Sequence, residues 1–487
     1  MADDRGPVAS DDILDLPAAG PTVIRGGVLR VLGYGAGVAM SVASAVVLLR
    51  YLSVADFGRY TQAIALVTIV AGLTDAGMTS IGVREYSVRE GAGRDALMRN
   101  LLGIRLVLTA AGLALALGFA LVAGYTAPML AGVALAGAAL VLQVAQGTIG
   151  VPLQAGLRLG WVTALDLLRQ GGTVLALLAA AVAGVGLAVL LAAPLPAALA
   201  LLVLTGWLVR GQVSLAPSFD SATWRWLLAL TLPFAAATAV GVIYAYVTVV
   251  LMSLVATEQE TGIFGAAFRV FVVIATIPGL LVMTAFPVLA RAARDDRRRL
   301  GYAVQRLFEV CMLLGIAVAL VTVVAAPTVI EVLAGSKYDG SVAVLRIQGI
   351  ALLASFLAAL GGFALLSLRR HRALLLANGA ALATASALTL ALAADYGAMG
   401  AAYANLAGES ALVAGYFLAL RRGEDGTQIS FELMPRLTLA AAAGVAVAFV
   451  VPLHPLLAAA LAGAVYAGAL VLLRAVPVEV FEALRPR

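Results

Sequence analysis

Several ionisable and amide side chains lie inside long apolar stretches of this sequence. Such a group is costly in hydrocarbon unless it faces a water-filled cavity or a partner, so each one is a candidate for function. Glu409 stands near the middle of the stretch 397–420, and Asn405 lies one helical turn before it on the same face. A carboxylate at that depth can exchange a proton or a cation as a cavity opens and closes. The alternative is a hydrogen bond to a neighbouring helix.

A second group of candidates contains both signs of charge. Asp166 and Arg169 share one helical face of the stretch 161–184. Either they form a structural ion pair, or Arg169 reaches towards a diphosphate or an acidic sugar, whose geometry suits a guanidinium fork. Asp75 and Arg269 lie within two further stretches, with a packing or pairing role as the alternative for each. Gln146 can meet ligand hydroxyl groups or join two helices.

Catalysis and metal binding are not indicated. The chain has one cysteine, Cys311, and two distant histidines, His371 and His454; these form no readable Cys–His metal cluster or nucleophilic dyad, and we expect no cofactor. A membrane glycosyltransferase needs paired acidic residues in a sizeable loop, whereas the segments between the apolar stretches are short and mostly basic. The net charge of +6 is spread over these segments rather than gathered in one patch. We therefore expect neither an enzyme nor a nucleic-acid-binding protein.

The elements that position these residues are membrane-spanning helices. Hydrophobic residues make up 63% of the chain and charged residues 12%, about half the charged fraction of a soluble domain. A span needs about 20 apolar residues. With this length as the criterion, the sequence divides into about fourteen spans, near 26–49, 60–83, 101–123, 128–150, 161–184, 186–209, 226–255, 262–290, 307–334, 342–368, 372–394, 397–420, 436–453 and 455–474.

The basic residues predict the orientation of these spans. Most of the 32 Lys and Arg residues fall in alternate segments between the spans, and the intervening segments contain only Arg50, Arg59 and Lys337. Because cationic loops are translocated poorly, this pattern predicts a multi-pass protein of the cytoplasmic (inner) cell membrane with both termini inside. Residues 1–24 are predicted to be an acidic cytoplasmic tail.

The first twelve spans form two similar halves. The segment 56–60 (DFGRY) at the start of the second span aligns with 260–264 (ETGIF) at the start of the eighth. An even number of spans per half gives parallel repeats with a path between them. We therefore expect an all-α integral membrane protein with a six-helix lobe at 25–210, a pseudo-symmetric six-helix lobe at 211–422, and a C-terminal helix pair with a tail at 423–487.

Several segments resemble a known family. Residues 49–60 (LRYLSVADFGRY) resemble the "R-x-L-G-x-x-x-F/Y-G-x-Y" junction of the polysaccharide flippases, which belong to the multidrug/oligosaccharidyl-lipid/polysaccharide exporter superfamily. Residues 261–269 (TGIFGAAFR) are similar to that family's "G-x-Y-x-x-A-x-R" element. Family members often carry a charged pair in the seventh span, where this chain has 244–248 (YAYVT).

The resemblance implies a flippase that passes a polyprenyl-(pyro)phosphate-linked oligosaccharide from the inner to the outer leaflet between two lobes that alternate access. It also implies that the helices carrying Asp75 and Arg269 border a central cleft. The expected partners are this lipid-linked substrate and membrane lipids, with the choice between H⁺ and Na⁺ as coupling ion left open. Alternatives within the superfamily are a cation-coupled drug antiporter and an exporter of a lipid-linked peptidoglycan precursor.

Overall fold

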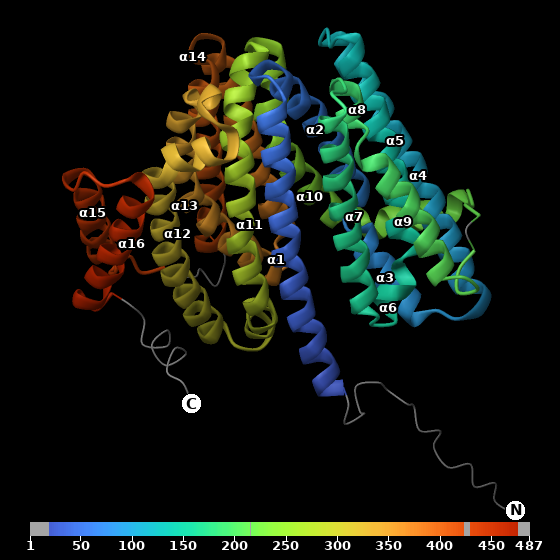
Figure 1. The fold of residues 1–487 in the computed structure, drawn as a ribbon. Coiled ribbons are helices and arrows are strands. Elements are labelled where there is room, and N and C mark those ends of the chain that lie inside the picture. Colours follow the sequence, from blue (N-terminus) through green and yellow to red (C-terminus); the bar gives the residue numbers. More distant parts are fainter. Residues whose placement is uncertain (1–18, 215, 423–428, 476–487) are drawn as a thin grey trace, which may run out of the picture.

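The computed structural model describes residues 19–214, 216–422 and 429–475. Within these ranges the regular structure consists of α-helices and one short 3₁₀ helix, with no strand (Figure 1). Helices pair their own backbone groups, which is what hydrocarbon requires of a spanning segment. In the described part of the chain, twelve helical segments are long and apolar enough to cross a membrane. The predicted all-α membrane class is confirmed.

The first group of helices, called here the N-lobe, is coloured from blue to green in Figure 1. Its α1 packs along α7, and α5 packs against α4 and α9. The second span is built from α2 and α3, and the sixth from α8 and α9. The N-lobe helices are α1 (Ala19–Tyr51), α2 (Val54–Asp75), α3 (Met78–Val88), α4 (Gly91–Val122), α5 (Ala127–Ile149), α6 (Val151–Ala155), α7 (Leu159–Val182), α8 (Leu187–Leu191) and α9 (Pro194–Leu208).

The second group, called the C-lobe, surrounds α13, which packs against three of its neighbours. Three of its helices also contact the N-lobe, because α10 and α11 both pack against α2 and α12 packs against α1. The C-lobe elements are α10 (Ser221–Val255), α11 (Glu258–Asp295), α12 (Arg297–Ala334), η2 (Ser336–Tyr338), α13 (Gly340–Ser367) and α14 (His371–Arg421).

Helix α14 is a hairpin of two spans. Its 51 residues would extend about 77 Å as one straight helix, far beyond a hydrocarbon core of about 30 Å. At Gly397 the backbone has φ 53° and ψ −130°, a conformation that essentially only glycine adopts. The two arms then run side by side, with Ala377 against Gly415 and Ala385 against Gly408. They correspond to the predicted spans 372–394 and 397–420.

The C-terminal pair consists of α15 (Met434–Val450) and α16 (Pro455–Leu472). It packs on α12, where the Tyr466 hydroxyl donates to the Leu313 carbonyl at 3.1 Å. The described part of the chain has twelve long apolar segments. Counting the two arms of α14 separately and adding the shorter α15 gives fourteen crossings, as predicted.

Some predicted boundaries are wrong. Helix α1 begins at Ala19, inside the predicted tail, of which residues 1–18 lie outside the described part. The cationic segments 84–99 and 291–306 are mostly helical, because arginine favours helices once the chain has left the hydrocarbon. Pro278 and Pro287 lie within a continuous α11 and do not interrupt it. By contrast, the second span breaks at Ala76 and Gly77, which both have positive φ.

Candidate functional site

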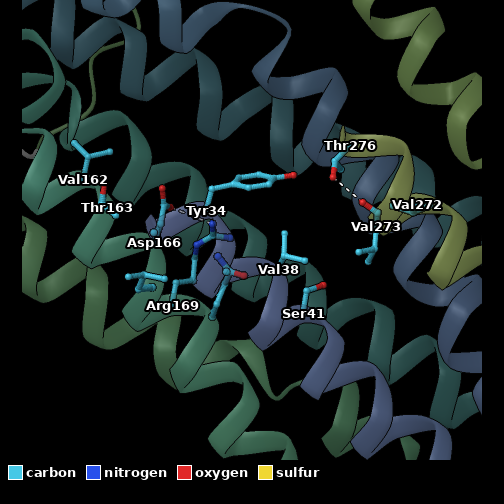
Figure 2. Close-up of a pocket in the computed structure, with 14 residues that line it drawn as sticks. Tyr34, Val38, Ser41, Val162, Thr163, Asp166, Arg169, Val272, Val273 and Thr276 are labelled. Carbon is cyan, nitrogen blue, oxygen red and sulfur yellow. Dashed lines mark hydrogen bonds and ion pairs between the residues drawn. The ribbon is translucent and has the colours of Figure 1, made fainter. Parts of the chain in front are cut away.

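Adjoining cavities lie along the seam between the two lobes. The first, called the N-side cavity, has about 390 Å³ and lies between α1, α7 and α11 (Figure 2). The second, called the C-side cavity, has about 250 Å³ and lies between α10, α11, α13 and α14. Both are lined by Val272 and Thr276 of α11. An apolar cavity of about 490 Å³ between α10, α13 and α14 shares Tyr246 with the C-side cavity.

The wall of the N-side cavity carries an ion pair. Arg169 donates to Asp166 with a separation of 3.2 Å, and their side chains are 39% and 58% exposed. Tyr34 projects across the cavity in Figure 2, with its ring directed towards Thr276. An ion pair with this much access to water is weak, so Arg169 can exchange Asp166 for another anion at little cost.

Arg269 of α11 lies where the lobes meet. Its guanidinium donates to the Ser41 hydroxyl of α1 at 3.2 Å, and it lines a small cavity together with Tyr60 and Tyr246. Among the described residues, no carboxylate forms an ion pair with Arg269 within 4.0 Å. A half-buried guanidinium of this kind attracts an anion.

Glu409 and Asn405 of α14 belong to one buried polar cluster. The Glu409 carboxylate accepts hydrogen bonds from the Tyr244 hydroxyl of α10 and the Ser355 hydroxyl of α13, both at 2.8 Å. Asn405 donates to Gln348 of α13 at 2.8 Å. Both Glu409 and Asn405 line the C-side cavity. Tyr244, which stands where the resembling family often has charge, thus serves as a donor to the carboxylate.

Asp75 lies at the break between α2 and α3, away from these cavities. It pairs with Arg105 of α4 at 2.8 Å, and Arg105 also donates to the Thr79 hydroxyl at 2.9 Å. The Arg105 side chain is 5% exposed and the Asp75 side chain 49%. The sequence reasoning did not select Arg105 as a candidate. An arginine close to the end of an apolar stretch can face inwards, and its partner thirty positions away gives no local signal.

Gln146 of α5 donates to the Thr205 hydroxyl of α9 at 3.0 Å, and so joins two N-lobe helices. The structure therefore brings together Glu409 with Asn405, and places Asp166, Arg169 and Arg269 along the seam. The sequence reasoning missed Ser355 and Gln348, because a serine or a glutamine in an apolar helix gives no sign of which helix it faces. No group of three potential metal ligands is found among the described residues.

Comparison with known proteins agrees with this architecture. A family described as "Polysaccharide biosynthesis protein" matches residues 47–343. A solved structure of the lipid II flippase MurJ in an inward closed conformation is 12% identical over 92% of this chain and 99% of that chain, with a TM-score of 0.78. Inward-facing and outward-facing structures of a multidrug resistance MATE transporter are each 15% identical. They cover 78% and 82% of this chain and 93% and 94% of theirs, with TM-scores of 0.56 and 0.55. No curated protein matches the sequence significantly.

Proposed function

The chain belongs to the polysaccharide biosynthesis protein family, and from that premise we propose that it flips a polyprenyl-(pyro)phosphate-linked oligosaccharide from the inner to the outer leaflet for surface glycan assembly. It is a multi-pass membrane protein with the fold of the MurJ and MATE structures, which are a flippase and a transporter and not enzymes. In this proposal the two lobes alternate access, the membrane is the cytoplasmic membrane and both termini lie inside.

The observation that carries the proposal is the guanidinium of Arg269 on the seam. It has a hydroxyl partner, and within the described part of the chain no carboxylate forms an ion pair with it. A diphosphate supplies the anion that such a site lacks, and an arginine can bind it with two parallel hydrogen bonds. Arg169, Gln170 and Tyr34 line the N-side cavity, where they can meet further phosphate oxygens and sugar hydroxyls. The N-side cavity of about 390 Å³ and the apolar cavity of about 490 Å³ are in the range of ligand sites, about 300–1,000 Å³.

Glu409 is the proposed coupling group. It is a buried carboxylate whose two oxygens accept from two hydroxyl groups, and it lies on the wall of a cavity that adjoins the seam. Exchange of a proton or Na⁺ at this carboxylate changes the charge of the C-lobe wall. Because a buried charge without a partner is costly, such exchange would bias the lobes between two arrangements, with Asn405 holding the adjacent turn of α14.

The test is flipping by the purified protein in liposomes. A fluorescent short-chain polyprenyl diphosphate oligosaccharide is placed in both leaflets, and a glycan-cleaving enzyme outside reports how fast the inner pool becomes accessible. We expect Arg269→Gln to lower the rate at least tenfold. The matched control is Arg346→Gln, because Arg346 is exposed on α13 and lines none of the described cavities. Flipping by Arg269→Gln at the wild-type rate would refute the proposed role of Arg269, and no flipping by the wild-type protein would refute the function.

Two specific observations favour second candidates. The fold likeness to the MATE structures supports a cation-coupled antiporter of small molecules, and that to MurJ supports an exporter of a lipid-linked peptidoglycan precursor. The same liposomes separate the three: transport of an organic cation favours the first alternative, and flipping only of a peptide-bearing head group favours the second.

A further inference from the structure

Polar contacts between the lobes gather at one end of the molecule, where α1 ends and α2 and α11 begin. Arg59 of α2 binds Glu258 of α11 at 2.6 Å and Asp56 of its own helix at 2.9 Å. Arg50 at the end of α1 donates to the carbonyl of Val332 on α12 at 2.7 Å. These contacts tie the N-lobe to two separate helices of the C-lobe.

Lys337 of η2 reaches back across the same seam. Its ammonium group donates to the carbonyl of Leu52 at 2.6 Å and to that of Arg50 at 3.1 Å. The first carbonyl belongs to the short connection between α1 and α2, and the second to the last turn of α1. Next to it, the rings of Phe57 and Tyr338 meet edge to face with centroids 6.0 Å apart. Arg50, Arg59, Glu258 and Lys337 are together called the latch.

Below the latch the two helices α2 and α11 touch backbone to backbone. A Cβ atom on Gly58 would collide with the Glu258 carbonyl, and a Cβ atom on Gly262 would collide with the Val54 carbonyl. One turn further, Gln62 donates to Thr261 at 3.1 Å in a buried position. The lobes are therefore in contact at this end. A rigid-body rotation of one lobe away from the other must break all of these contacts together.

At the other end of the seam the lobes are separated on the side of α1. There the N-side cavity separates α1 and α7 from α11, while α10 stays packed against α2 and α4. The positive-inside pattern predicts that the latch end faces outwards, since Arg50, Arg59 and Lys337 are the basic residues of the outer segments.

We propose that the latch is the outer gate, which holds the lobes together in the state with the N-side cavity open and must break before cargo leaves on the outer side. This inference rests on the proposed alternating access. It gives the 49–60 segment a role in holding the lobes together. Ligand binding would not explain this segment, because Arg50 and Arg59 face the partner lobe rather than a cavity. It also explains why cations stand on a side of the membrane where they are disfavoured.

The experiment measures how often the gate opens, by a readout that does not depend on transport. Ala65→Cys introduces a thiol in the small buried cavity below the latch, in a background where the single native cysteine, the buried Cys311, is alanine. A membrane-impermeant maleimide is added to intact cells. When opening is fast compared with labelling, the labelling rate is proportional to the population of the open state.

We expect Glu258→Gln to raise the labelling rate about 2- to 5-fold, the range for an ion pair whose side chains are 33% and 38% exposed. Lys337→Met should raise it by a similar or larger factor, and the double variant by roughly the product, about fourfold or more. Asp56→Asn is the matched control, because it breaks the bond of Arg59 inside the N-lobe and leaves the bond between the lobes. Its rate should stay within about twofold of the wild-type rate.

The charge exchange Arg59→Glu with Glu258→Arg, made in the Asp56→Asn background, should bring the rate back towards that of the control. A double variant Glu258→Gln/Lys337→Met that labels at the wild-type rate overturns the latch, as does an Asp56→Asn rate equal to that of Glu258→Gln. Because the readout is thiol labelling and not transport, the latch can fail while the flipping assay succeeds, and flipping can fail while the latch holds.

Discussion

The ion pair between Asp75 and Arg105 offers a sharp test of how the N-lobe is held together. Arg105 is buried, with its guanidinium bonded to Asp75 and to the Thr79 hydroxyl. In the Asp75→Asn variant the side chain keeps its size and one acceptor oxygen but loses its charge. The guanidinium then stays in the lobe without a counter-charge.

The size of the loss in stability follows from how far the side chains of Asp75 and Arg105 are exposed. Breaking a fully buried pair by removing one charge costs about 3–5 kcal/mol. Asp75 is 49% exposed while Arg105 is 5% exposed, so water screens one partner and the asparagine oxygen still accepts a bond. We therefore expect Asp75→Asn to lower the free energy of unfolding by about 2 kcal/mol. In an Arg105→Met background no cation remains, and the same change should cost less than about 0.5 kcal/mol.

The measurement is the free energy of unfolding in bicelles by steric trapping, which reports an equilibrium for proteins whose thermal unfolding is irreversible. The four proteins of the Asp75→Asn and Arg105→Met cycle give a coupling energy of about 1.5–2 kcal/mol. Asp166→Asn is the control, since its partner Arg169 is exposed and the cost should be under about 0.5 kcal/mol. Equal costs of Asp75→Asn in the two backgrounds would refute the reasoning.

Three further predictions concern separate parts of the chain. Gly397→Ala should destabilise the α14 hairpin by about 1–3 kcal/mol, because φ 53° with ψ −130° is a backbone conformation that excludes a Cβ atom. The same unfolding assay checks this prediction. The control is Gly379→Ala, because Gly379 is helical and has open space around it. The Tyr244→Phe change removes one of two donors to Glu409 and should alter the pH dependence of flipping, whereas loss of overall rate with an unchanged pH profile would show a packing role only. Asp220 caps α10, and its hydrogen bond from the Thr223 hydroxyl holds the pKa of the carboxyl below its ordinary value. A depressed pKa means that the charged cap contributes fully above about pH 4 and that this contribution is lost as the pH falls through the folded-state pKa. Asp220→Ala should therefore lower the apparent thermal midpoint by more at pH 7 than at pH 3. Asp220→Asn keeps an acceptor oxygen and should lower it by less than Asp220→Ala at pH 7.

The membrane fold could be read from the sequence because two independent patterns agree on it. Apolar length marks the spans, and alternation of arginine marks the sides, so a missed span would have reversed all later segments. The α14 hairpin shows the strength of this approach: a helix-length criterion alone would give one element of 51 residues, whereas a span-length criterion divides it near Gly397. The break at Gly77 was missed because a second span of ordinary apolar length gives no reason to look for one.

The site was predicted less completely, and the reason is geometric. Depth along a helix can be counted from the sequence, so Glu409 and Asn405 could be selected as buried polar groups. Which neighbour a side chain faces depends on rotation and packing between helices distant in sequence. Tyr244 and Ser355, which complete the Glu409 cluster, stand 165 and 54 positions away from it. Arg105 was not selected for the same reason.

The packing of Gly58 and Gly262 connects the repeat with the proposed transport. These two glycines align in the predicted repeat, and they meet reciprocally, each against the carbonyl four positions before the other. The pseudo-twofold axis therefore passes close to this crossing, and under the same register Arg59 corresponds to Ile263. The backbone packing at this crossing is thus symmetric, whereas the charged side chains beside it are not. A cleft between identical walls would suit a symmetric ligand. Here one wall carries the pair Arg169 and Asp166, and the other carries the carboxylate of Glu409. This asymmetry suits a cargo whose two ends differ, with a charged head group and an apolar chain.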